Sequence, residues 1–153
     1  MSSISTIYDN LLSLVSTAIG GSGEGYIELP NPYNLADNNQ LFLKKGYGVA
    51  IGPGVGLELH VGCRISYERI FTVVLTKEMA TTDHNITART SFNKELIEDF
   101  VLVRRALEDD PTLSQACIKT QYTADSGLEF TATDTQRFIS VSIDVIIQYE
   151  ENL

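Results

Sequence analysis

Residues 137–149 read RFISVSIDVIIQY, and this stretch decides the fold class. Apolar side chains occupy the odd positions from Ile139 to Tyr149, whereas the even positions hold mostly Ser, Asp and Gln, with Ile146 as the exception. Alternation with a period of two places the two sets of side chains on opposite faces of a β-strand. We therefore predict a long strand with one face buried in a core.

Three further strands are predicted upstream, and the first is a short one at Tyr26–Leu29. Residues 63–76, CRISYERIFTVVLT, alternate in the same way, and Arg69 interrupts the apolar set, so we expect a bulge or an interface there. Residues 44–51, KKGYGVAI, also alternate, and Gly52-Pro53-Gly54 is expected to end that strand in a turn that continues through Val55-Gly56.

The last third of the chain is predicted to be a meander of three strands. A strand at residues 116–123 is followed by a hairpin turn at Ala124–Gly127, and a short strand then contains Leu128 and Phe130. A second turn at residues 133–135 leads into the final strand.

Two amphipathic helices complete the pattern. The first twenty residues have helical spacing from Ile4 to Ala18, with Ser3 or Ser5 as cap and Gly20 at the end. A second helix contains Phe92, Leu96, Phe100, Val103 and Leu107, and it ends at Asp110-Pro111. With 153 residues we expect one α+β domain, a mainly antiparallel sheet with both helices packed on one face.

The charge balance excludes some functions. Twenty acidic and eleven basic residues give a net charge of −9, and the basic residues are scattered, so tight nucleic-acid binding is disfavoured. The N-terminus lacks the basic start of a signal peptide, and no apolar run is long enough to span a bilayer. We expect a protein that is made and folded in a cytoplasm and does not bind a membrane.

No pattern indicates a metal, a cofactor or catalysis. Cys63 and Cys117 lie far apart and are expected to be buried thiols in strands, with a disulfide between them as the alternative. The glycines of IGPGVG at 51–56 lack the following Lys-Ser/Thr of a phosphate loop. Asp83-His84 provide pieces of a hydrolase triad without a placed nucleophile, so we predict no enzyme activity, no cofactor and no metal.

Residues 29–40, LPNPYNLADNNQ, form a loop of unusual length. Its prolines forbid a helix interior, and Asn and Asp favour turns. Tyr33 is predicted to be an interface anchor or to pack on its own domain, and both alternatives stay open.

Four segments carry a family resemblance. They are LPNPYNLADNNQLFLKKGYGVAIGPG at 29–54, RIFTVVLT at 69–76, LEDDPTL at 107–113 and FISVSIDVIIQYEENL at 138–153. In this order and spacing the chain resembles the tail terminator (tail completion) proteins of tailed bacteriophages, which begin with an amphipathic helix and pass through an LPNPY-type loop into a strand of this kind.

The resemblance implies a virion protein without an active site, assembled in the host cytoplasm. It would form a homohexameric ring that caps the tail tube and joins it to a neck protein, while DNA passes through the lumen without specific binding. Contacts are expected at residues 29–40, 52–59 and 77–88, and the candidate interface residues are Pro30, Asn31, Pro32, Tyr33, Asp37, Lys44, Lys45, Tyr47, Pro53 and Arg69.

Other functions remain open at this point. Another neck or connector protein, such as a stopper or adaptor, or a tail tube subunit would also form rings. A small hydrolase or ligand-binding domain would instead show a pocket with converging polar groups.

Overall fold

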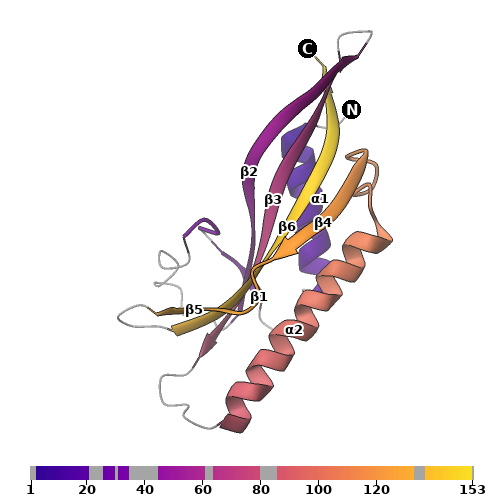
Figure 1. Cartoon of the computed structure of the whole chain (residues 1–153). Helices are drawn as coiled ribbons and strands as arrows, with labels where there is room; N and C mark the ends of the chain where they lie inside the picture. The colour runs from indigo at the N-terminus through magenta and orange to yellow at the C-terminus, as the bar shows by residue number, and fades with distance from the viewer. Residues whose placement is uncertain are drawn as a thin grey trace.

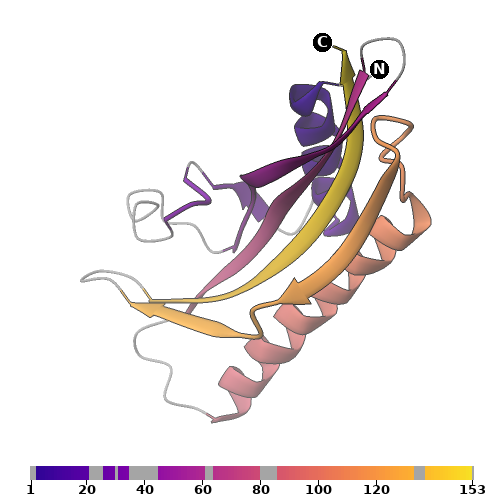
Figure 2. The same cartoon turned by 45° about the horizontal axis from the view of Figure 1, so that its top comes forward.

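A computed structural model describes residues 3–20, 26–29, 31–34, 45–60, 64–79, 86–132 and 137–152 (Figure 1). In these ranges two helices lie on one face of a strongly bent sheet (Figures 1 and 2). The predicted α+β class, a mainly antiparallel sheet with both helices on one face, is confirmed.

Three long strands form the centre of the sheet. They are β2 (Lys45–His60), β3 (Arg64–Met79) and β6 (Arg137–Asn152), each 16 residues long. β3 lies between the other two and pairs antiparallel with both, so the predicted central position of the 63–76 strand is confirmed. A short strand, β1 (Tyr26–Glu28), pairs parallel with the first residues of β2 and is one end of the sheet order.

The helices cover the face on which the odd-numbered side chains of β3 and β6 lie. α1 (Ile4–Ala18) is capped by Ser3, whose hydroxyl accepts from Thr6 N–H, and α2 (Ile86–Asp109) ends before Pro111 as predicted. The buried side chains come from both helices and from the alternating strands: Ile7, Leu11, Val15, Leu96, Val103, Leu107, Phe71, Val73, Leu75, Ile143, Val145 and Ile147. The alternation therefore marks the core correctly.

The prediction that β2 ends at Gly52-Pro53-Gly54 is wrong. The strand continues to His60, and the pairing with β3 shifts between Ile51 and Gly54 and again between Gly56 and Glu58. These shifts are bulges, in which extra residues leave the ladder without ending it. Residues 52–59 are consequently a strand and not the contact loop that we expected.

The prediction of a three-stranded meander is also wrong. β4 (Lys119–Asp125) and β5 (Glu129–Ala132) both pair antiparallel with β6, at successive positions along it. Residues 126–128 therefore interrupt one long edge strand and do not form a hairpin, and Ser126 N–H still donates to the carbonyl of Ser142 (2.9 Å). The predicted turn at 133–135 lies outside the described residues.

An unusual turn joins α2 to β4. Leu113, Ser114 and Gln115 all have positive φ angles, of 49°, 57° and 68°. The amide of Asn10 on α1 donates to the Leu113 carbonyl (2.9 Å), and the carboxylate of Asp110 accepts from Ser114 N–H (3.0 Å). These bonds and the buried Leu113 side chain stabilise a left-handed backbone conformation, which is unfavourable for residues other than glycine.

Cys117 lies in this turn. It is a half-buried free thiol and not a strand residue, so the sequence prediction is wrong in its placement. Burial raises the pKa of the Cys117 thiol to about 11. Cys63 lies outside the described residues.

Candidate interaction site

The segment Asn31-Pro32-Tyr33-Asn34, called the NPYN segment below, makes a local turn. The side-chain oxygen of Asn31 accepts from Tyr33 N–H (3.1 Å) and from Asn34 N–H (3.2 Å). A short amide side chain that bonds the backbone two and three residues ahead stabilises a turn without any long-range partner. The turn therefore follows from the sequence of the segment itself.

Leu29 and the NPYN segment lie against the outer edge of β2. Leu29 N–H donates to the carbonyl of Tyr47 (2.8 Å), which extends the pairing of β1 by one bond. A Cβ at Gly46 would lie 2.6 Å from Leu29 Cδ2, and one at Gly48 would lie 2.9 Å from Pro32 Cβ. Gly46 and Gly48 thus make room for Leu29 and Pro32, because any larger side chain at the two glycines would overlap with them.

Tyr33 makes a further contact with the outer edge of β2. Its hydroxyl accepts from the backbone N–H of Ile51 (2.9 Å), while 67% of the residue surface remains exposed. A tyrosine can do this because it has a polar tip on a large apolar ring. Tyr33 therefore bonds its own domain through the hydroxyl, while its role as an interface anchor stays a prediction that the exposed ring permits.

A groove of about 560 Å³ opens between α1 and the NPYN segment, and we call it the NPYN groove. Its lining consists of two tyrosines, four apolar residues and one carboxylate: Tyr8, Tyr33, Leu29, Pro32, Val49, Ile51 and Glu28. Burial raises the pKa of Tyr8, and the charge of Glu28 raises it further. The groove therefore combines aromatic and apolar residues with polar surface, and its one charged residue is the carboxylate of Glu28.

Lys45 and Tyr47 lie on the helix side of β2. The Lys45 ammonium lies 5.4 Å from the ring centroid of Tyr26, a cation–π distance. Tyr47 packs against the core. These two predicted interface residues therefore face inward, because the strand alternation turns odd positions of β2 toward the helices.

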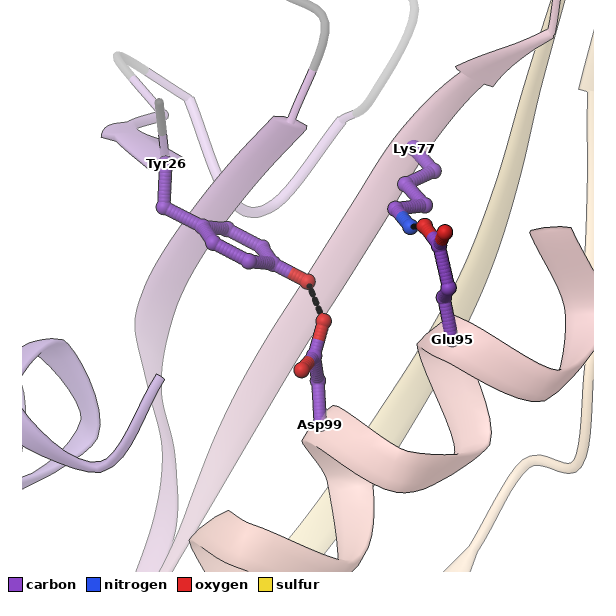
Figure 3. A network of polar contacts seen from close by, with 4 residues as sticks. All are labelled: Tyr26, Lys77, Glu95 and Asp99. Carbon is purple, nitrogen blue, oxygen red and sulfur yellow. Dashed lines mark hydrogen bonds and ion pairs between the residues drawn. The ribbon is translucent and has the colours of Figure 1, made fainter. Parts of the chain in front are cut away.

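A polar network that sequence reasoning missed lies beside them (Figure 3). The Tyr26 hydroxyl donates to a carboxylate oxygen of Asp99 (2.5 Å), and Lys77, which is 1% exposed, forms an ion pair with Glu95. Burial raises the pKa of Tyr26, and the hydrogen bond to Asp99 raises it further. The only sequence signal was Lys77 at an apolar position of β3 and two acids four residues apart on α2.

Arg69 holds the first bulge of β2. Its guanidinium donates to the carbonyl of Gly52 (2.9 Å) and to the hydroxyl of Tyr149 (3.2 Å). The sequence predicted a bulge or an interface at Arg69, and the bulge is present on the facing strand, while β3 pairs with β6 without a break. Pro53 next to it is exposed.

The predicted interface residues thus fall into separate groups. Asn31, Pro32 and Tyr33 lie together at the edge of β2, whereas Pro53 and Arg69 lie further along the strand at the bulge. Pro30, Asp37 and Lys44 lie outside the described residues, as do residues 80–85 of the 77–88 contact segment, whose two ends belong to β3 and α2.

The described residues also bear on metal binding, membrane insertion and the predicted pieces of a hydrolase triad. Within the described ranges no group of three or more His, Cys, Asp or Glu side chains is placed to hold a metal ion, and no helix is long and apolar enough to cross a membrane. Asp83 and His84, the pieces of a hydrolase triad, lie outside these ranges.

Comparisons with known proteins find similar chains among solved structures. Neither a family model nor a curated protein matches the chain. Among solved structures, a chain of "Virion of native gene transfer agent (GTA) particle" is similar with a TM-score of 0.32 and 11% sequence identity, over 93% of this chain and 91% of that chain.

Proposed function

We propose that this chain is a structural virion protein that forms a ring at the end of a phage tail tube, and that it has no catalytic role. The observation that carries the proposal is the joint geometry of its most distinctive motif. Leu29 and Pro32 fit against Gly46 and Gly48 of the KGYG stretch. Together the two stretches present Tyr33 and the NPYN groove at a sheet edge.

Open sheet edges support an assembling role. In the described part of the chain, β2 has no strand partner on its outer side beyond the residues that β1 covers, and β4 with β5 forms the opposite edge. Edge strands readily pair with other chains. A ring requires contacts between two different surfaces of each subunit, and opposite edges of one sheet provide two such surfaces.

The mechanism would be geometric. A ring that matches the symmetry of the last tube ring would block the addition of further tube subunits and would offer its other face to a neck protein. The carboxylates of a chain with a charge of −9 would repel the phosphates of DNA in the lumen.

Imaging of tail tubes mixed with the purified protein tests this proposal. We expect a collar at one end of each tube, and tubes without the protein serve as the control. Binding along the tube side, or no binding, contradicts the proposal. Long cylinders formed by the protein alone would identify a tube subunit instead.

A further inference from the structure

The NPYN groove has the composition of a site for an aromatic side chain beside a cation. Most of its lining residues are apolar or aromatic, part of the exposed lining is polar, and Glu28 is its charged residue. Glu28 is exposed, and among the described residues no cation forms an ion pair with it. A volume of about 560 Å³ exceeds that of a single phenylalanine ring, so a side chain and part of its backbone fit together.

The hairpin of β5 and β6 presents that combination on the same chain. Phe130 pairs with Ile139, which is two residues after Arg137 on β6, so the side chains of Phe130 and Arg137 lie on one face of the hairpin. Diagonal neighbours of this kind lie roughly 7 Å apart, within reach of long side chains. Phe130 is 59% exposed, Arg137 is exposed, and no described acid forms an ion pair with Arg137.

A single copy cannot bring the hairpin and the groove together. β5 lies at one edge of the sheet and β1 at the other, with β6, β3 and β2 between them. At about 4.8 Å between neighbouring strands, four steps separate the two elements by roughly 19 Å. The hairpin also extends away from α2 in both views (Figures 1 and 2), which leaves it accessible to another molecule.

We propose that the NPYN groove binds the β5–β6 hairpin of a second copy of this chain, with Phe130 in the groove and Arg137 against Glu28. Aromatic residues and Arg are the types that contribute most to interface affinity, and opposite charges at the rim fix the register. The exposed ring of Tyr33 becomes buried in this contact. Each copy uses its groove for one neighbour and its hairpin for the other, so the contact is heterologous and closes into a ring when the rotation fits.

This inference rests on the proposed ring, and a charge exchange in the full-length protein tests it. The variants E28R and R137E are each expected to weaken self-association about tenfold or more, because each places like charges opposite one another. The double variant E28R/R137E restores the attraction with reversed polarity and is expected to recover most of the wild-type association. Sedimentation velocity over a concentration series gives the association constants.

Matched variants control for net charge and for apolar surface. D109R and R105E change the charge by the same amounts at exposed positions near the end of α2, and both are expected to associate as the wild type does. F130A is expected to weaken association, whereas L102A, which alters a side chain that is 44% exposed on α2, is not.

Three outcomes overturn the inference. Single charge variants that associate normally, or a double variant as weak as the singles, place the contact elsewhere while the ring itself stands. A wild-type chain that stays monomeric at every soluble concentration also overturns the inference. The imaging of tail tubes then tests the proposed function independently.

Discussion

Tyr26 shows how one residue links the first strand to the second helix. Its hydroxyl reaches across the core boundary to Asp99, and its ring lies under the ammonium of Lys45. Tyrosine suits this position because its apolar ring is buried while the hydroxyl finds a polar partner. The residue therefore contributes both to burial and to the position of α2.

A tyrosine-to-phenylalanine exchange at position 26 tests this contribution. We expect Y26F to lower the free energy of unfolding at neutral pH by about 1–2 kcal/mol, because a hydrogen bond to a carboxylate is lost. Urea unfolding of the variant and the wild type gives the difference. An unchanged unfolding midpoint would contradict the role of the bond.

The same pair of proteins has a predicted pH dependence. The pKa of Tyr26 is raised above its ordinary value of 10.0 in the folded protein, first by burial and then by the bond to Asp99. Above about pH 10 the unfolded chain loses this proton while the folded chain keeps it, so wild-type stability falls as the pH rises. Y26F lacks this term, and the gap between the two proteins should narrow in unfolding series extended to about pH 11. A constant gap would contradict the assigned cause.

At the scale of elements, the bulge in β2 divides the strand into two parts with different surroundings. Before Ile51 the outer edge of β2 is covered by β1 and the NPYN segment, and after Gly52 no strand of the described residues pairs with that edge. The change coincides with Arg69, whose guanidinium bonds the Gly52 carbonyl. A bulge increases local twist and bends the strand, which separates the two parts.

Glycine at position 52 is required by this geometry. A Cβ there would lie 2.8 Å from the backbone oxygen of Ile70, which cannot move without breaking the ladder. We expect G52A to lower the free energy of unfolding by about 1–3 kcal/mol, as overpacking does. G56A is the matched control in the same strand, because its nearest neighbour would lie at an ordinary 3.7 Å. Thermal unfolding compares them, and equal effects would contradict the steric explanation.

At the scale of the whole molecule, charge and shape act together. The sheet is strongly bent, its helices cover one face, and its two edges carry different groups: the NPYN groove on one side and the exposed Leu128 and Phe130 on the other. Different edges favour head-to-tail contacts over two-fold ones. A net charge of −9 opposes contact with phosphate and favours solubility.

The charge gives a whole-molecule prediction about DNA. We expect no measurable binding of duplex DNA by the protein or its assemblies, even at low salt, because phosphate contacts by Lys and Arg supply non-specific affinity. Fluorescence anisotropy of a labelled duplex in a salt series measures it. Binding at low salt that weakens steeply as salt is added would contradict a repelling lumen.

The sequence by itself determined the fold class, both helices, the central strand and the buried faces. Each of these follows from a period of side chains along a continuous stretch, and a period needs no information from elsewhere in the chain. The turn of the NPYN segment is local in the same sense, since Asn31 bonds residues two and three positions ahead. These features could be predicted because the residues that cause each of them lie in the same segment that adopts the structure.

Only the tertiary structure decided how the segments meet. Gly52-Pro53-Gly54 has the composition of a turn, and pairing with β3 together with the Arg69 bonds makes it a bulge. Ala124–Gly127 likewise has hairpin composition, yet both flanking strands pair with β6. Glycine and proline are compatible with both a turn and a bulge. Which of the two forms depends on the backbone hydrogen bonds to a strand that is distant in the sequence. The groove beside Tyr33 depends on such long-range pairings too, so no local pattern contained it.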